Sequence, residues 1–225
     1  MKKSFVATFV LASFLCLSFL TTANAYPNIY IGQEIYFKDG PGTTNGGEFV
    51  LYPSNSTTEL YRSFCLETNE YLDFSSKFIV GDISTEARKG GTGGGSPDLL
   101  DPRTAYLYHQ FYWGALAEYD YLDNASGVFK TRAESANALQ KAIWYFEQEN
   151  GGATNYYTDL AQAKVNSGEW VGLGDVRVIN LLYASNKAFA QDQLTVAPVP
   201  EPATMLLLGT GLIGLAGLGR KKLLK

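Results

Sequence analysis

The stretch TRAESANALQKAIWYFEQENGG, residues 131–152, predicts the central helix of the fold. Thr131 is followed three residues later by Glu134, a spacing typical of a capping box, in which two side chains satisfy backbone groups where a helix begins. Residues 133–149 are dense in helix-forming residues, and the paired glycines at the end of the stretch supply a stop. The middle of the chain is therefore expected to be helical.

One polar residue on this helix is unusual. Gln140, Ile143 and Trp144 stand at positions i, i+3 and i+4, so they share one face, and the two apolar members predict that this face points inward. A carboxamide on an apolar face must find partners or it costs free energy. Backbone groups or water would satisfy Gln140 in an ordinary core.

The chain before this helix is expected to be largely extended. Stretches rich in β-branched and aromatic residues, separated by Gly and Pro turns, predict strands at 28–37, 48–52 and 59–67. Alternation along the third strand places Cys65 near its end, on the face opposite Phe64 and Leu66. The glycine-rich residues 90–97 predict a flexible loop, because the Gly-Lys-Ser/Thr of a phosphate cradle is missing.

The remaining elements complete a mixed fold. Residues 104–119 predict a helix with Leu107, Phe111, Gly114 and Ala115 on a shared face. Further elements are predicted as a helix at 159–166 and strands at 176–183 and 194–197. Together they indicate the α+β class, as one domain over residues 26–198 with extended ends around a helical middle.

The N-terminus has the pattern of a secretory signal. Lys2 and Lys3 precede an apolar stretch over residues 5–20, and a small-x-small pattern ends at Ala25. We expect signal peptidase to cut between Ala25 and Tyr26, so that residues 1–25 are a signal peptide. The alternative, a membrane anchor, is disfavoured because the apolar stretch is short and a polar, cleavable segment follows it.

The C-terminus combines three features in a fixed order. Pro200, Glu201 and Pro202 precede an apolar segment at 205–218, and a basic cluster at 220–222 follows it. This pattern resembles the PEP-CTERM sorting signal of Gram-negative bacteria, so residues 199–225 are expected to be a sorting segment. The resemblance implies a transient inner-membrane helix, cleavage near the motif by an exosortase, and release to the cell surface or the medium. The basic cluster is expected to face the cytoplasm.

Charge and composition exclude several classes of protein. The full chain has a formal net charge of −4, and six of its 18 basic residues lie in the two end segments, so the processed chain is more acidic still. Such a surface repels nucleic acid, and no nucleic-acid partner is expected. An aromatic content of 14% argues against disorder and for a packed core.

The expected processing leaves the chain with a single cysteine. Cys16 lies inside the expected signal peptide, so cleavage leaves Cys65 as the only cysteine and no intramolecular disulfide can form. In an oxidising compartment a lone cysteine is expected to be buried and inert, paired between chains, or committed to chemistry.

Two short motifs together resemble those of a known family. Residues 64–66, Phe-Cys-Leu, and residues 139–144, Leu-Gln-Lys-Ala-Ile-Trp, match in order the motifs of bacterial thioester domains found in surface adhesins, and residues 105–111 are similar to that family's intervening helix. The resemblance implies an internal thioester between Cys65 and Gln140, shielded by Phe64 and Trp144. An amine-bearing surface or matrix partner would attack it and stay joined to Gln140 by an amide. This implies a single-use covalent binder rather than an enzyme, without cofactor or metal.

Alternatives remain open. A non-reactive extracellular matrix protein with the same sorting tail would hold Cys65 and Gln140 as ordinary core residues. A thiol hydrolase would pair Cys65 with His109, the only histidine, which also is a candidate to take a proton from the attacking amine. Glu67 is a similar candidate. The acidic residues near 120–124 favour a turn ending at Gly127 over a calcium loop, because their spacing is irregular.

Overall fold

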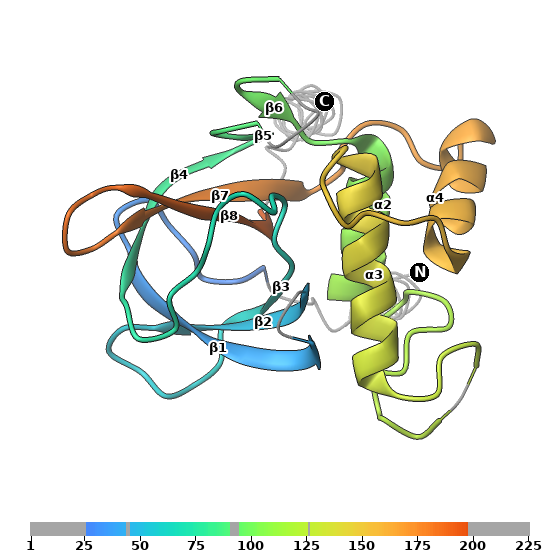
Figure 1. Ribbon diagram of the computed structural model, residues 1–225, viewed down its shortest axis with the longest axis horizontal. Coiled ribbons are helices and arrows are strands. Elements are labelled where there is room, and N and C mark those ends of the chain that lie inside the picture. Colours follow the sequence, from blue (N-terminus) through green and yellow to red (C-terminus); the bar gives the residue numbers. More distant parts are fainter. Residues whose placement is uncertain (1–25, 44–45, 91–94, 126, 198–225) are drawn as a thin grey trace, which may run out of the picture.

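A computed structural model describes residues 26–43, 46–90, 95–125 and 127–197 (Figure 1). The predicted signal peptide and sorting segment, including its apolar residues 205–218, lie outside these ranges. A six-stranded sheet stands beside a group of three helices. The α+β class predicted from the sequence is confirmed. Within the described residues, no helix is both long and apolar enough to cross a bilayer.

The main sheet is antiparallel throughout, with the strand order β3-β2-β1-β4-β7-β8. A separate two-stranded ribbon pairs β5 with β6. The strands are β1 (Glu34–Thr43), β2 (Gly46–Pro53), β3 (Tyr61–Ser63), β4 (Phe78–Ser84), β5 (Glu86–Ala87), β6 (Asp98–Leu99), β7 (Val176–Tyr183) and β8 (Phe189–Val196).

The two edges of the main sheet meet at the residues that follow β3. The backbone N–H of Leu194 donates to the carbonyl of Phe64 at 3.1 Å, and that of Leu66 donates to the carbonyl of Asp192 at 3.3 Å. Cys65 forms an isolated antiparallel bridge with Gln193. The chain after β3 therefore runs along β8 and joins the first strand of the order to the last.

Three helices lie together on one side of the sheet (Figure 1): α2 (Pro102–Tyr112), α3 (Arg132–Phe146) and α4 (Tyr156–Asn166). Thr131 caps α3, because its side chain accepts the backbone N–H of Glu134 at 3.1 Å. The predicted capping box is only half formed, since the Glu134 carboxylate accepts the N–H of Lys130 instead. A complete capping box occurs at the start of α4, between Asn155 and Thr158.

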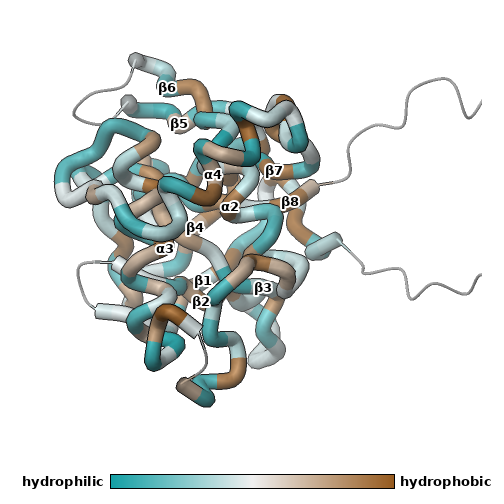
Figure 2. The backbone as a smooth tube through the Cα atoms, turned by 90° about the vertical axis from the view of Figure 1, so that its right-hand side faces the viewer, coloured by the Kyte–Doolittle hydropathy of each residue, from teal (hydrophilic) through white to brown (hydrophobic). Residues whose placement is uncertain are grey.

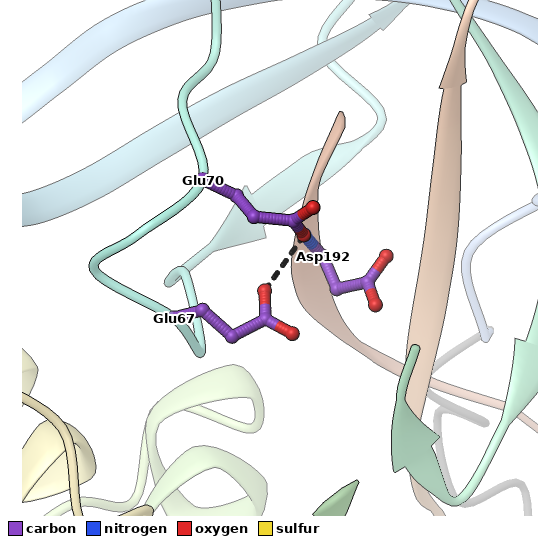
Figure 3. Close-up of side chains that lie close together, drawn as sticks. All are labelled: Glu67, Glu70 and Asp192. Atoms are coloured by element: carbon purple, nitrogen blue, oxygen red, sulfur yellow. Dashed lines mark hydrogen bonds between the residues drawn. The ribbon is translucent and has the colours of Figure 1, made fainter. Parts of the chain in front are cut away.

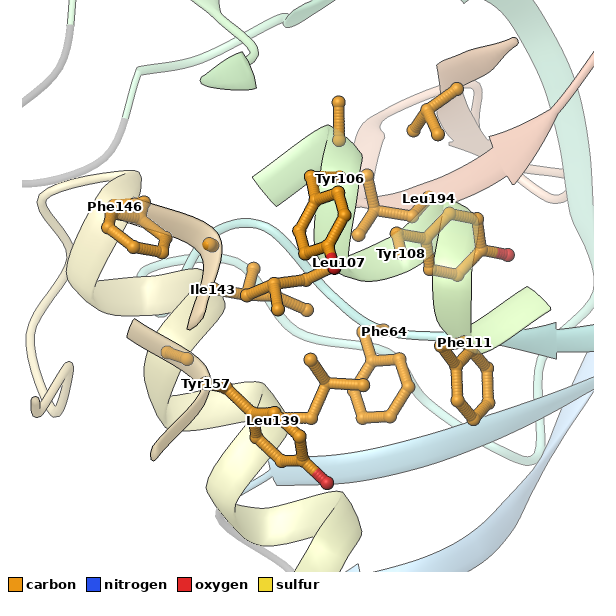
Figure 4. Close-up of a cluster of buried hydrophobic side chains, with 14 of the residues drawn as sticks. Phe64, Tyr106, Leu107, Tyr108, Phe111, Leu139, Ile143, Phe146, Tyr157 and Leu194 are labelled. Atoms are coloured by element: carbon orange, nitrogen blue, oxygen red, sulfur yellow. The ribbon is translucent and has the colours of Figure 1, made fainter. Parts of the chain in front are cut away.

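Two apolar clusters form the core. One lies between the helices and the sheet and contains Phe64, Leu107, Leu139 and Ile143 (Figure 4). The other lies on the opposite face of the strands, where Ile35, Phe37, Leu51, Tyr61, Phe78, Val80, Ile179, Leu181 and Ala190 pack together. Apolar and polar residues alternate closely along the described parts of the chain (Figure 2), as expected where each element buries one face.

Several strand predictions need correction. The first strand begins at Glu34 rather than 28, the third is confined to Tyr61–Ser63, and the last begins at Phe189 rather than 194. No strand was predicted at β4, where Gly81 and a register shift between Val80 and Asp82 interrupt the alternation. Residues 176–183 form β7 as predicted.

The helix boundaries also differ from prediction. The helix predicted at 104–119 ends at Tyr112, because Gly114 takes a positive φ of 70° and turns the chain; Gly114 and Ala115 therefore lie beyond it. The central helix ends at Phe146 rather than 149, before the glycines, since Gln148 already has a φ of 59°. The helix predicted at 159–166 begins earlier, at Tyr156.

Candidate functional site

Cys65 lies where the sheet edges meet. The chain on both sides of it is hydrogen-bonded to β8, so its backbone is fixed by Phe64 before it and Leu66 after it. Phe64 and Leu66 point into the core beneath the helices, and only 1% of Cys65 is exposed. It is the one cysteine among the residues that the structure describes, and it forms no disulfide there.

Gln140 brings its carboxamide to this thiol from α3. The Cys65 Sγ lies 3.4 Å from Gln140 Oε1, and Gln140 Nε2 donates to the carbonyl oxygen of Cys65 at 2.8 Å. Gln140 is 1% exposed, so the carboxamide on the apolar helix face finds its partners in the cysteine segment. The two residues lie 75 positions apart in sequence and contact one another through both functional groups.

The electrostatics keep the thiol protonated. Burial raises the pKa of Cys65 above its ordinary value, and the carboxylates of Glu67 and Glu149 add to this rise. The indole of Trp144, which lies beside the sulfur, opposes this rise. Reactivity of this cysteine as a free thiolate is therefore low, and any reaction with Gln140 depends on their contact rather than on an exposed anion.

A cavity of about 440 Å³ reaches Cys65 from the surface. Its wall includes Cys65, Trp144 and the aromatic residues Phe49 and Phe74. The remaining lining residues are Asp39, Thr43, Gly46, Glu48, Thr68, Glu70, Tyr71, Leu72, Asn150, Gly151 and Gln191. A small molecule or a flexible side chain can thus approach the sulfur.

The two residues predicted to shield the bond lie in different places. Trp144 lines the cavity and is 9% exposed, so its ring stands between the pair and solvent. Phe64 is fully buried, packs edge-on against Phe111 at 4.9 Å between ring centroids, and does not line the cavity. Trp144 is placed to restrict water, whereas Phe64 supports the cysteine segment from the core.

His109 contacts a different group. Its Nδ1 lies 2.6 Å from Asp175 Oδ1, and its ring lies 5.0 Å from that of Trp170. The indole of Trp113 donates to the other Asp175 oxygen at 3.2 Å, and the ring of Tyr26 packs edge-on against Trp113. His109 does not line the cavity at Cys65, so the geometry gives the thiol hydrolase hypothesis no support.

Other residues near the pair were not predicted. Thr68 donates from its N–H and its hydroxyl to Glu149 Oε2 at 3.0 and 2.7 Å, which ties the segment after Cys65 to the chain after α3. Gln191 Nε2 donates to the carbonyls of Glu67 and Glu70. The polar run from Gln191 to Gln193 inside an otherwise apolar C-terminal strand is the sequence signal that marks this position.

The acidic residues near 120–124 form a turn. Asp120 is 2% exposed, and its carboxylate accepts the backbone N–H groups of Asn124 and Ala125, both at 3.0 Å. Gly127 follows with a φ of 79°. This arrangement agrees with the predicted turn.

Comparison with known proteins identifies one segment. The family described as PEP-CTERM protein-sorting motif matches residues 198–221. No curated protein and no solved structure matches the chain. The chain thus carries a PEP-CTERM sorting motif, which indicates export and transient membrane sorting to the cell surface with exosortase processing.

Proposed function

We propose that this exported protein forms an internal thioester between Cys65 and Gln140 and uses it to capture an amine-bearing partner covalently. The observation that carries this proposal is the contact of Cys65 Sγ with Gln140 Oε1 at 3.4 Å. The carboxamide carbon is bonded to that oxygen, so it lies within reach of the sulfur. The similarity of residues 64–66 and 139–144 to thioester-domain motifs supports the same pairing.

Bond formation follows from holding the two groups together. The sulfur adds to the carboxamide carbon, the thiol proton passes to Nε2, and the C–N bond breaks to release ammonia. This condensation is very slow between free molecules, and fixing both reactants in one geometry supplies much of the missing rate. The hydrogen bond from Nε2 to the Cys65 carbonyl orients the amide plane for attack.

Capture of a partner transfers the Gln140 acyl group from the Cys65 sulfur to the partner's nitrogen. A neutral primary amine attacks the thioester carbonyl, the C–S bond breaks, and a new amide joins the partner's nitrogen to the Gln140 side chain. The proton lost by the amine passes to the Cys65 sulfur and restores its thiol. Each molecule therefore reacts once, which is binding rather than turnover. Burial of the bond behind Trp144 slows the competing attack by water.

The cavity suits an amine of this kind. Asp39 gives its wall negative charge, which favours the approach of an ammonium group. The carboxylates of Glu48 and Glu70 contribute little, because Arg62 and Arg132 bind the first and Lys89 pairs with the second. Exposed rings at Tyr71 and Phe74 offer apolar surface for the stem of a lysine side chain.

Intact mass spectrometry of the purified chain tests the bond. We expect a mass short by one ammonia relative to the polypeptide defined by its own terminal residues. Cys65→Ala and Gln140→Ala should each lack this deficit. Gln162→Ala, which changes a glutamine on α4 away from the pair, should retain it. Full polypeptide mass in protein purified gently near neutral pH contradicts the proposal.

Reaction with methylamine distinguishes a protein that captures amines from an inert matrix protein. We expect methylamine to add at Gln140, with one newly titratable thiol appearing at Cys65 for each molecule labelled. An inert core, in which Cys65 and Gln140 only share hydrogen bonds, gives neither product. Peptide mapping locates the label, and labelling elsewhere without thiol release would favour the matrix alternative.

A further inference from the structure

Three carboxylates lie close together at the segment that follows Cys65. Glu67 and Glu70 come from this segment and Asp192 from β8, and one oxygen of each lies within 4.8 Å of the others (Figure 3). They are 1%, 7% and 1% exposed. Like charges brought together away from water are costly, so the cluster requires compensation by a cation or by protons.

Two of the three carboxylates have strong partners. Asp192 Oδ1 accepts the N–H of Leu181 at 3.1 Å, and its Oδ2 accepts the Asn180 side chain at 2.8 Å and the N–H of Arg88 at 2.7 Å. Glu70 Oε1 pairs with the ammonium of Lys89 at 2.9 Å. These contacts fix both side chains in place.

Glu67 is only half satisfied. Its Oε2 accepts the backbone N–H of Asp192 at 3.3 Å, but its Oε1 is buried and has no hydrogen-bond donor among the residues that the structure describes. Figure 3 shows the Glu67 side chain directed towards Glu70 and Asp192. A buried anionic oxygen without a partner is costly, so this atom indicates that a further group binds here.

We propose that Glu67, Glu70 and Asp192 bind one calcium ion. Lys89 offsets one of the three negative charges and leaves two, which one divalent ion neutralises. The donors are all oxygen atoms, which Ca²⁺ and Mg²⁺ prefer to the nitrogen and sulfur that suit zinc. The irregular arrangement, with two carboxylates already committed to other contacts, suits the flexible coordination of Ca²⁺ better than the octahedron that Mg²⁺ demands.

The cluster is accessible from solvent, and the backbone that carries it is already held in place. Glu70 and Gln191 line the cavity of about 440 Å³, so a hydrated ion can reach the cluster from solvent. Gln191 Nε2 holds the carbonyls of Glu67 and Glu70 at 2.8 and 2.9 Å, which fixes the backbone between the two glutamates. Bound calcium would then tie the segment after Cys65 to β8.

Thermal unfolding of the purified full chain in CaCl₂ and in EDTA tests the site. We expect the midpoint to rise with calcium concentration, and calorimetric titration to give one ion per chain. Glu67→Gln should weaken binding by about ten-fold or more. Glu147→Gln, which changes another buried carboxyl outside the cluster, should respond as the original chain does.

An unfolding midpoint that is equal in CaCl₂ and EDTA, with no heat of binding, would overturn the site and leave Glu67 as a protonated core residue. A calcium response that Glu67→Gln leaves unchanged would overturn it as well. Titration of the unaltered chain decides the question even if Glu67→Gln does not fold. Cys65→Ala should keep the response, so this result is independent of the thioester.

Discussion

At the scale of single residues, the indole N–H of Trp144 is a buried donor that has no hydrogen-bond acceptor within the described part of the chain, and it lies beside the Cys65 sulfur. When an amine opens the proposed thioester, this sulfur would depart with negative charge. A donor placed at that position stabilises the departing atom. Trp144→Phe keeps an aromatic ring, although a smaller one, and removes the N–H, so we expect methylamine to react roughly ten-fold more slowly while the bond still forms.

The rate of methylamine addition, followed by intact mass, measures this effect. Trp170→Phe is the matched control, because the Trp170 indole donates to the carbonyl of Gly172 and lies outside the cavity. The two variants should carry the same ammonia deficit at the start. Equal rates for both would show that Trp144 acts through its ring alone.

The sequence identifies the residues of the site better than their surroundings. Cys65 and Gln140 were paired from two motifs, and the structure brings them into contact. Phe64 was assigned as a shield because it belongs to the first motif, and His109 as a proton acceptor because it is the only histidine. Packing of Phe64 against Phe111 and the contact of His109 with Asp175 depend on distant parts of the chain. A motif fixes which side chains can react, and only the fold decides which neighbours they meet.

At the scale of elements, the end of the β1–β2 hairpin packs directly on α3. Gly46, at a φ of 142°, lies so close that an added Cβ would stand 2.7 Å from Gln140 Cγ and 3.0 Å from Trp144 Cη2. Gly46→Ala must therefore push the hairpin off the helix or strain it. We expect a loss of about 1–3 kcal/mol in the free energy of unfolding, and faster hydrolysis of the thioester.

Urea unfolding gives the first quantity, and the decay of the ammonia deficit with time gives the second. Gly172→Ala provides the control: Gly172 also has a positive φ, of 67°, but an added Cβ there would meet nothing within 4 Å. It should lose stability through backbone strain without any change in hydrolysis. Unchanged hydrolysis in Gly46→Ala would contradict a shielding role for the hairpin.

Elements whose signals lie within one continuous stretch of sequence were predicted, and elements that depend on contacts with distant parts of the chain were not. The central helix was found from its cap, its composition and its inward face, all of which are contained in one continuous stretch. Strand β4 was missed because its bulge at Gly81 makes sense only against its partner β7. The start of β8 was missed because buried Gln191, Asp192 and Gln193 look like loop residues until the groups they satisfy are known.

At the scale of the whole molecule, the closure of the sheet decides whether a site exists. Residues 64–66 and β8 are far apart in sequence, and their hydrogen bonds bring the cysteine under α3. Alternation and composition predict strands and the α+β class, but they do not specify which edges meet. The contact between Cys65 and Gln140 is therefore a product of topology, although the two residue types are visible in the sequence.

Stability of the whole molecule should fall as pH rises from mildly acidic to mildly basic. Burial raises the pKa of Glu147 from 4.5 to about 8, so the folded chain holds a proton that the unfolded chain has released across this window. The folded state then binds more protons, and the free energy of unfolding decreases with pH, by no more than about 5 kcal/mol for this group. Burial raises the pKa values of Glu67 and Asp192 as well, which adds in the same direction.

Glu147→Gln should flatten this dependence without removing it, because its side chain is neutral at every pH while Glu67 and Asp192 still titrate. Urea unfolding at pH 5 and pH 8, in EDTA, measures the difference. Glu169→Gln is the control, since Glu169 is exposed and its pKa is lowered by Lys164, so its titration lies below the window. If Glu147→Gln and the original chain lose equal stability between the two pH values, then Glu147 is ionised in the folded protein and a cation or a rearranged side chain must compensate its charge.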